Sequence, residues 1–338
     1  MNHGLKTVAE TNALITSGRA LLVAGAQPLL EQLEPGRWIG GTIPYFMGQD
    51  GGVETDTLLF VTELGPRFVS VELASYGADE LSRIPRDYPQ HGVSFIIVPA
   101  GCEAHARFAR DGGSYPGFFE RPLVGWVAGT SLSRIGLDAP RVFDGSRRTS
   151  WADRAIVLHA SLRPDVVVRT DIINLFHPAP DSPVLTFDDE GFSVTWCRVN
   201  GERRRLAEVL ATRGQPLDAP LVADWSGAHL NVSLQRVDAA TGRVDFYAPV
   251  FKGVEYRFPL VPADYERAFR DELERRRIEP LFACNCVLNY LAAGLAGRRS
   301  GALQGPFTFG EIAWMLLNQT AVYVTLESRP EAAALPHG

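Results

Sequence analysis

Apolar runs alternate with polar and glycine-rich segments along the chain, and their spacing predicts many short strands. The clearest run is 93–100, Val-Ser-Phe-Ile-Ile-Val-Pro-Ala, which is rich in β-branched residues. A continuous apolar run of this kind is typical of a strand that is buried on both faces. The same criteria predict further strands at 56–63, 67–73, 122–129, 192–199, 229–236 and 243–250.

Helical patterns occupy other parts of the chain. Residues 5–34 show a helical pattern that Gly18 and Pro28 interrupt, and helical patterns also follow predicted strands at 103–110 and 202–213. Asp264 stands where it can cap another amphipathic helix. Together these patterns predict an α+β fold in which helices flank β-sheets.

A proline-rich segment at 177–183 is the best candidate for a connector between two halves. We therefore expect two β-sheet-containing domains, 1–183 and 184–330. Both contain a predicted strand that reaches a cysteine and enters a helical pattern, at Cys102 in the first and Cys284 in the second. This shared order indicates either a pseudo-repeat of two related halves or a chance likeness.

Two cysteines near the C-terminus are candidates for chemistry. Cys284 and Cys286 stand where an apolar run gives way to a helical pattern. A thiol at such a junction faces free N–H groups and the positive end of a helix, which lower its pKa and favour a nucleophile or redox sensor. The alternative is a small buried side chain between sheet and helix. A C-x-C pair alone is only a weak signal for a metal site.

Glu311 and Asn318 also have two interpretations each. Glu311 follows Thr308 by three positions, which fits the capping box of a helix. Alternatively, its carboxylate lies at the mouth of a pocket, where it binds a ligand amine or acts as a base. Asn318 either belongs to the same pocket or shapes a turn before the last apolar strand.

Several aromatic residues lie beside glycines in loop-like contexts, as is common in the lining of small-molecule pockets. The alternative is that these rings fill the ends of a β-rich core. The glycine pair within the predicted strand at 36–47 indicates a bulge or a close approach of the backbone to a ligand or another strand. The candidates for such a pocket are the rings of Trp38, Tyr45 and Trp126 and the glycines Gly40, Gly41 and Gly129.

Signatures of cofactors and metals are weak in this sequence. His105 follows Cys102 by three positions, which suits a Cys–His pair or an axial haem ligand as well as an ordinary helical histidine. No H-x-x-x-H, H-E-x-x-H or spaced Cys/His set occurs, so we predict no metal site, with His105 as the one weak candidate. A P-loop, a G-x-S-x-G elbow and a dinucleotide fingerprint are also missing. We therefore predict no cofactor, and haem remains an alternative.

Charge and composition narrow the class of partners. The chain has 338 residues and a formal net charge of −6, which gives no basic footprint for nucleic acid. The runs 203–205 and 275–277 are arginines next to acidic residues, which we interpret as solvated helix faces. No apolar stretch approaches the roughly 18–20 residues of a membrane span. Four unevenly spaced cysteines do not form a disulfide framework, and we expect a cytoplasmic protein.

With these residues in view, the C-terminal half resembles the FIST family (F-box and intracellular signal transduction proteins). The resemblance lies in the order of blocks, with a departure after the strand-end cysteine, where the family often places Arg and this chain has Asn285-Cys286. The N-terminal half fits the family's glycine-rich domain only loosely. The blocks are Val199-Asn-Gly201, Pro249-Val-Phe-Lys-Gly253, Phe282-Ala-Cys284, Phe307-Thr-Phe-Gly-Glu-Ile312 and Asn318-Gln-Thr320.

The resemblance implies a stand-alone protein with FIST N-like and FIST C-like domains. It further implies a sensory role in signal transduction, with a ligand such as an amino acid or a related metabolite, and some members of the family are linked to haem. We expect a small-molecule pocket between the halves, and a homodimer or a signalling protein as partner. The expected ligand-binding residues are Trp38, Gly40, Gly41, Tyr45, Trp126, Gly129, Cys284, Glu311 and Asn318.

Two other functions remain open from the sequence. The first is an acyl-transfer or hydrolytic enzyme in which Cys284 or Cys286 is the nucleophile and His105 or His159 is the base. The second is a haem or metal sensor that uses His105 and a cysteine.

Overall fold

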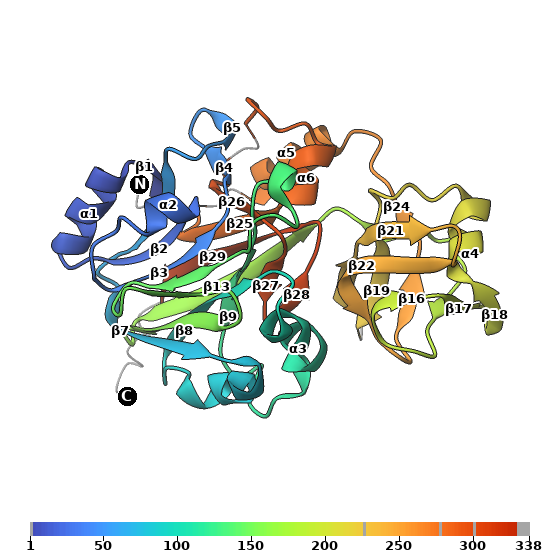
Figure 1. Cartoon of the computed structure of the whole chain (residues 1–338), viewed down its shortest axis with the longest axis horizontal. Helices are drawn as coiled ribbons and strands as arrows, with labels where there is room; N and C mark the ends of the chain where they lie inside the picture. The colour runs from blue at the N-terminus through green and yellow to red at the C-terminus, as the bar shows by residue number, and fades with distance from the viewer. Residues whose placement is uncertain (1–2, 226–227, 277–278, 300–301, 330–338) are drawn as a thin grey trace, which may run out of the picture.

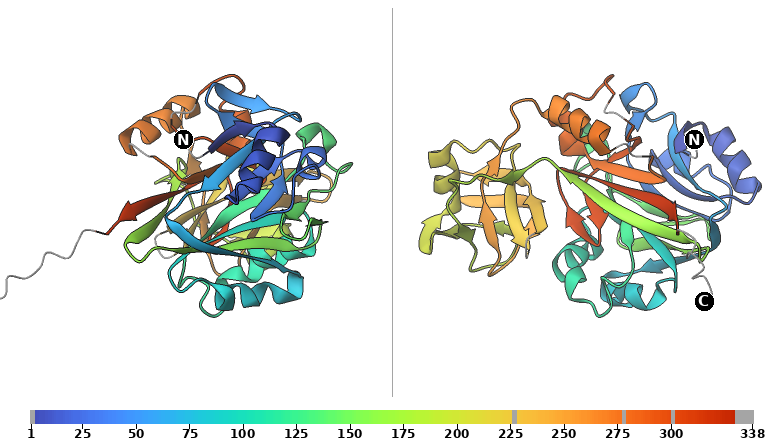
Figure 2. Two further views of the ribbon diagram at one scale, coloured as in Figure 1. Left: turned by 90° about the vertical axis from the view of Figure 1, so that its left-hand side faces the viewer. Right: turned by 180° about the vertical axis from the view of Figure 1, so that it is seen from behind.

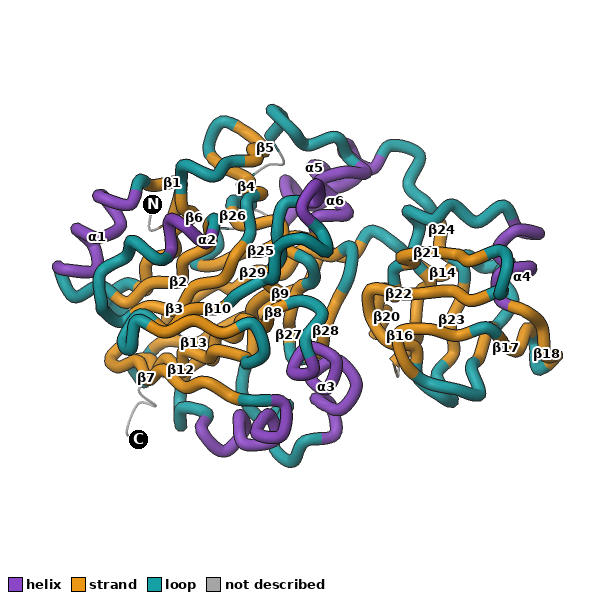
Figure 3. The backbone as a smooth tube through the Cα atoms, in the orientation of Figure 1, coloured by secondary structure: helices purple, strands orange, loops and turns teal. Residues whose placement is uncertain are grey.

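The computed structural model describes residues 3–225, 228–276, 279–299 and 302–329. It is a mixed α and β fold, as the sequence predicted, with a large body and a smaller β-rich unit at one end (Figure 1). Strands form the interior of both parts and helices lie at the periphery (Figure 3).

The first sheet of the body is formed mainly by the N-terminal segment. Residues 5–34 were predicted to be helical, which is wrong over β2 (Ala20–Gly25), because a short apolar run does not by itself distinguish a buried strand from a helix. Two short helices, α1 (Val8–Thr16) and α2 (Gln27–Leu30), pack against the outer face through Ile15 and Leu30. In order across the sheet, the strands are β1 (His3–Lys6), β6 (Leu59–Leu64), β2 (Ala20–Gly25), β3 (Trp38–Thr42), β10 (Val142–Asp144) and β11 (Thr149–Trp151).

Two further six-stranded sheets complete the body. The second sheet contains, in order, β28 (Met315–Leu317), β27 (Glu311–Ala313), β9 (Leu123–Ala128), β8 (Gly92–Pro99), β12 (Ala155–Leu162) and β7 (Phe68–Tyr76). The third contains β13 (Val166–Asn174), β29 (Thr320–Ser328), β25 (Phe282–Cys286), β26 (Gly305–Thr308), β4 (Tyr45–Gly48) and β5 (Gly51–Glu54). The strand predicted at 93–100 is confirmed by β8, all of whose residues are buried.

One apolar core joins the three sheets, with Ile39, Phe95, Trp126, Phe282 and Val322 among its members. The outer face of the second sheet is covered by α3 (Glu103–Asp111) and the 3-10 helix η1 (Ala78–Asp87). The outer face of the third sheet is covered by α5 (Tyr265–Arg276), and α6 (Val287–Ala292) follows β25 directly. Helices therefore cover the outer faces of a β-sheet core.

The strand pairing does not follow the predicted division into 1–183 and 184–330. The strand β27 pairs with β9, β26 pairs with β4, and β29 pairs with β13. The C-terminal strands 282–328 are thus built into the sheets of the N-terminal segment, where they bury apolar residues that neither segment covers alone. Of the chain between these two segments, residues 185–258 lie outside the body.

That part, residues 185–258, is named here the small β domain, and it projects from one end of the body (Figure 2). It has an apolar core of its own, which includes Leu185, Val244 and Tyr256. One sheet has the order β18 (Glu202–Arg205), β17 (Trp196–Val199), β15 (Leu185–Thr186), β23 (Glu255–Arg257), β19 (Leu221–Trp225) and β20 (Ala228–Val232). The other has the order β16 (Gly191–Val194), β22 (Arg243–Val250) and β21 (Leu234–Asp238), and α4 (Leu206–Arg213) lies beside them.

The chain enters and leaves the small β domain at one place, because β14 (His177–Pro178) pairs with β24 (Pro259–Leu260). The tight turn predicted at Asn200-Gly201 is confirmed, since both residues have positive φ between β17 and β18. Arg203, Arg204 and Arg205 are exposed, as predicted, but they lie on the strand β18, so only the helical part of that prediction is wrong.

Among the described residues, no helix is both long and apolar enough to cross a membrane.

Candidate functional site

Glu311 is the most unusual side chain of the body, because its carboxyl group is fully buried. It begins the short strand β27, where it lies opposite Trp126 on one side and Leu317 on the other. Thr308 ends the strand β26, and a strand rather than a helix follows Glu311. The capping-box interpretation of Thr308 and Glu311 is therefore wrong.

The partners of the Glu311 carboxyl are neutral groups. One oxygen, Oε2, accepts hydrogen bonds from Thr320 Oγ1 at 2.8 Å and from Thr320 N at 3.3 Å. The other, Oε1, lies 3.4 Å from Thr308 Oγ1, and the Cys286 thiol also hydrogen bonds to this carboxyl. No ion pair to Glu311 is found among the described residues. Burial without a compensating cation raises the pKa of Glu311 to about 8, although the hydrogen bonds act in the opposite direction.

The two candidate cysteines lie in the same buried region. Both belong to β25, and Cys284 Sγ donates to Gly125 O at 3.2 Å. Cys286, rather than Cys284, is the N-cap of α6. Burial raises the pKa of both thiols well above their ordinary value, and the Glu311 carboxyl adds to the effect. The junction therefore does not produce the low-pKa, accessible thiol that a nucleophile requires.

A chain of side-chain hydrogen bonds leads from Glu311 to α6. Asn289 Nδ2 donates to Thr320 O at 3.3 Å and to Asn285 Oδ1 at 2.8 Å, and Asn285 Oδ1 also accepts from Cys286 N. Asn289 is 1% exposed, and its Oδ1 has no hydrogen-bond partner. An unpartnered buried carbonyl oxygen costs free energy unless a ligand or water meets it.

Asn318 is the second such side chain. It follows β28, its Nδ2 donates to Leu317 O at 3.0 Å, and its Oδ1 has no partner. Its own backbone oxygen accepts from Asn231 Nδ2 of the small β domain at 3.1 Å. Next to it, Gln319 Oε1 accepts from Ser233 Oγ at 2.7 Å. The region around Glu311 therefore lies where the small β domain meets the body.

The structure brings five of the nine expected ligand-binding residues into this region or its wall. Trp126 packs on Phe282, with ring centroids 5.8 Å apart, and its Nε1 has no hydrogen-bond partner. Gly41 faces Trp126 across the core, because a Cβ at residue 41 would lie 3.1 Å from Trp126 Nε1 and 2.6 Å from Ile97 Cγ2. The close approach at this glycine is thus to side chains of the facing sheet. The five are Gly41, Trp126, Cys284, Glu311 and Asn318.

The other four expected residues lie elsewhere. Trp38 belongs to the apolar cluster under α1 and α2, and a Cβ at Gly40 would lie 3.1 Å from the Trp38 ring, so both face away from Glu311. Tyr45 accepts at its hydroxyl from Leu132 N at 2.9 Å and contacts the ring of Tyr290. Gly129 lies under the ring of Phe309, since a Cβ at residue 129 would lie 2.3 Å from Phe309 Cδ1.

His105 has an apolar environment. Its Nδ1 accepts from Gly101 N at 3.2 Å, its Nε2 has no partner, and its ring packs near Phe192 at 5.9 Å. Burial lowers the pKa of His105 to about 4, so the ring is neutral near pH 7. In the described part of the chain, no group of three or more His, Cys, Asp or Glu side chains is arranged to hold a metal ion.

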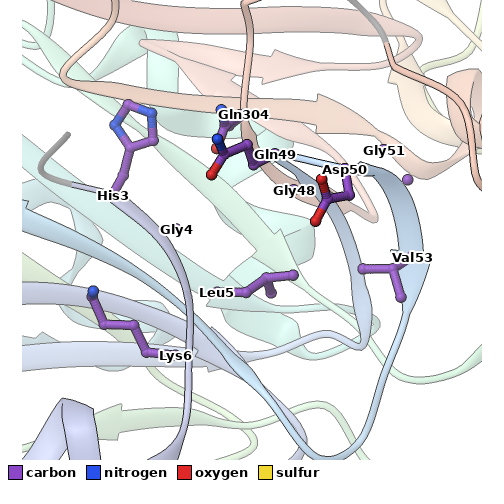
Figure 4. A pocket seen from close by; sticks show the side chains of 11 residues that line it. His3, Gly4, Leu5, Lys6, Gly48, Gln49, Asp50, Gly51, Val53 and Gln304 are labelled. Carbon is purple, nitrogen blue, oxygen red and sulfur yellow. The ribbon is translucent and has the colours of Figure 1, made fainter.

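Open pockets lie on other parts of the surface. One, of about 540 Å³, lies between β1 and the tip of the β4–β5 hairpin, where His3, Gln49 and Gln304 face one another (Figure 4). A second, of about 1100 Å³, is lined by paired charges such as Arg276 and Asp171. A cavity of about 10 Å³ beside Cys284 has room for at most one water molecule. The Glu311 region is thus closed in this conformation.

Sequence reasoning missed three polar residues of the site. Asn289 lies inside the helix α6, and Asn231 and Ser233 come from the small β domain, far away in the sequence. Asn289 did carry a signal, since a carboxamide within an apolar helical pattern must find buried partners.

Comparison with protein families gives one finding. The model of a family of unknown function, DUF6976, matches residues 6–327. The search of curated proteins found no match to the chain.

Proposed function

The chain belongs to the DUF6976 family, whose function is unknown, and we propose that it is a cytoplasmic small-molecule-binding protein with its ligand site around Glu311. The observation that carries this proposal is a set of buried polar groups without sufficient partners. Glu311 has no cation beside it among the described residues, and the Oδ1 atoms of Asn289 and Asn318 are unpartnered. A bound ligand would supply the missing partners, and such groups cluster at functional sites.

Access to the site would come from movement of the small β domain. This domain has its own apolar core, and it meets the body near Glu311 through polar side chains such as Asn231 and Ser233. Apolar contacts to the body come from a few residues, Phe192, Leu230 and Ala248. An interface in which polar contacts are mixed with few apolar ones opens more readily than a large apolar one. Opening and closing around a ligand would also give the protein a way to report binding to a partner.

Two further features support a sensory function. The C-terminal blocks that resemble the FIST family include Phe307–Ile312 and Asn318-Gln-Thr320, which contribute Thr308, Glu311 and Asn318 to this region. The units β8–α3–β9 and β25–α6–β26 each pair their strands in parallel and each begin the helix at a cysteine, Cys102 or Cys286. This likeness supports a common origin of the two units, with the site at the second one.

Native mass spectrometry of the full chain tests the proposal. Protein purified from its host is expected to carry a small molecule, which the Glu311→Gln variant loses and the Asp144→Asn variant keeps. Asp144 is a suitable control because its carboxyl is also buried but lies on β10 in the first sheet. The proposal is ruled out if the parent chain and both variants carry no small molecule and no compound of a metabolite library stabilises the parent chain.

A further inference from the structure

The balance of hydrogen-bond donors and acceptors around Glu311 restricts the chemistry of what binds there. The amide nitrogen of Asn289 is fully used, because both of its contacts, Asn285 Oδ1 and Thr320 O, are acceptors. The amide nitrogen of Asn318 likewise donates to an acceptor, Leu317 O. These partners fix the orientation of both carboxamides, and in each of them the oxygen is the atom left without a partner.

The carboxyl of Glu311 shows the same shortage of donors. Both contacts from Thr320 go to Oε2. The single proton of Thr308 Oγ1 has a nearer acceptor in Gly310 O, at 3.0 Å, than in Glu311 Oε1, at 3.4 Å. The Cys286 thiol also hydrogen bonds to this carboxyl, but a thiol is a weak donor. Asn289 Oδ1 and Asn318 Oδ1 thus have no donor, and beyond Thr320 the Glu311 carboxyl has only weak ones.

These three side chains belong to one connected region. Thr320 links two of them, since its Oγ1 donates to Glu311 and its carbonyl accepts from Asn289. Asn318 precedes Thr320 by two residues, and all three side chains are at most 1% exposed. No Lys or Arg side chain forms an ion pair or hydrogen bond with them within the described ranges. Near pH 7 the positive charge at Glu311 is therefore a bound proton, which a cation would replace.

From this arrangement we infer that the group bound at the site is a small cation, held by the oxygens of Glu311, Asn289 and Asn318. The inference rests on the proposed ligand site and specifies its chemistry. Carboxylate and carboxamide oxygens are the ligands of hard cations such as Na⁺, K⁺, Mg²⁺ and Ca²⁺. The same oxygens accept hydrogen bonds from an ammonium group, which has donors and no acceptor. An anionic head group has acceptors and no donor, so it would leave the Asn289 and Asn318 oxygens without a partner.

Thermal unfolding of the full chain distinguishes these sources. The protein is dialysed into tetramethylammonium chloride, whose cation has no N–H donor and is larger than the metal ions and methylammonium. Equal ionic strengths of NaCl, KCl, MgCl₂, CaCl₂ or methylammonium chloride then replace it. A saturable rise in Tm of roughly 2–4 °C is expected at about a hundredfold excess over Kd for one of these cations. If a metal salt gives the rise, the bound group is a metal ion, and if methylammonium gives it, the bound group is an ammonium group.

Variants assign the effect to the site. Glu311→Gln should abolish the rise, while Asp144→Asn should keep it. Asn318→Asp adds a negative charge to the site and should strengthen the cation-dependent rise, which keeps the test informative if Glu311→Gln fails to fold. The inference is overturned if no cation raises the Tm above its value in tetramethylammonium chloride. It is also overturned if the Tm of Glu311→Gln rises as much as that of the parent chain. If Glu311→Gln does not fold, the same criterion applies to Asn318→Asp. If a neutral or anionic molecule is then found to bind and its binding requires Glu311, the proposed function still stands. If no ligand of any charge binds, the inference and the proposed function are both wrong.

Discussion

Thr320 holds one oxygen of Glu311 with two hydrogen bonds, from its backbone N–H and from its hydroxyl. This pair joins β27 of the second sheet to β29 of the third at a point where both strands are fully buried. The carboxyl is thereby fixed in position, while its other oxygen stays poorly partnered. The predictions below follow from this arrangement and from the buried groups elsewhere in the body.

The first prediction concerns the pH dependence that Glu311 imposes on stability. Its pKa is raised in the folded state to about 8 from 4.5, so the folded chain binds a proton that the unfolded chain releases. The contribution is full below pH 4.5 and is lost as the pH rises through 8. Between pH 4.5 and pH 8, the free energy of unfolding of the parent chain should fall by up to about 1.4 kcal/mol per pH unit relative to that of Glu311→Gln. Urea unfolding at pH 5 to 9 measures it.

The neighbouring titratable groups add little to this pH dependence. Burial raises the pKa of Cys284, Cys286 and Tyr265, which face Glu311, above their ordinary values, so they stay neutral over most of the window. A difference between parent and Glu311→Gln that is constant with pH would contradict the raised pKa.

The second prediction concerns the thiols. Cys102 is partly exposed, whereas Cys197, Cys284 and Cys286 are buried. In the native protein a thiol reagent should modify Cys102 alone, and the others should react only after unfolding. The Cys102→Ser variant should lose the native reaction. Rapid modification of Cys284 or Cys286 near pH 6 would instead support the cysteine-dependent enzyme.

The third prediction concerns His159, which lies in a buried hydrogen-bond chain. Its Nδ1 contacts Ser94 Oγ at 2.8 Å and its Nε2 contacts Tyr76 Oη at 2.9 Å, while Tyr76 donates to Asp87 at 2.7 Å. Burial lowers the pKa of His159 to about 4 from 6.5, so the unfolded chain binds more protons in this range. Stability should therefore fall as the pH drops from 6.5 to 4.

His159→Gln should remove this part of the acid dependence at a cost of about 1–2 kcal/mol at pH 8. The exposed His177 provides the control, because it is not part of this hydrogen-bond chain and His177→Gln should leave the stability at pH 8 unchanged. An unchanged acid slope in His159→Gln would show that other groups cause the loss.

The fourth prediction concerns Gly41. A methyl group at this position would lie 2.6 Å from Ile97 Cγ2 in the core between the sheets. Gly41→Ala should cost about 1–3 kcal/mol through overpacking. Gly113→Ala is the control, because its Cβ would meet only Phe119, at an ordinary 3.7 Å. Chemical denaturation compares the two, and equal stabilities would contradict the close packing.

Local patterns predicted part of this fold. The buried strand β8, the helix α3 and the turn at Asn200-Gly201 follow from short-range sequence signals, and the structure confirms them. The placement of the C-terminal strands does not, because the pairing of β27 with β9 depends on apolar faces almost 200 residues apart. Without that pairing, a helix cap and a pocket carboxylate were both open interpretations of Glu311.

The candidate site was predictable in the same limited sense. Glu311, Asn318 and Cys284 stood out as polar or reactive residues in an apolar segment, and the structure places them in one buried region. Trp38 and Gly40 were grouped with them by composition alone. The alternation of side chains along β3 sends these two to the opposite face from Gly41.

A high-resolution crystal structure of the full chain purified from its host tests the central claim most directly. We predict non-protein density other than water that contacts Asn289 Oδ1, Asn318 Oδ1 and the Glu311 carboxyl, with the small β domain closed over it. Well-ordered density in which water molecules or protein donors alone meet these three groups would contradict the account.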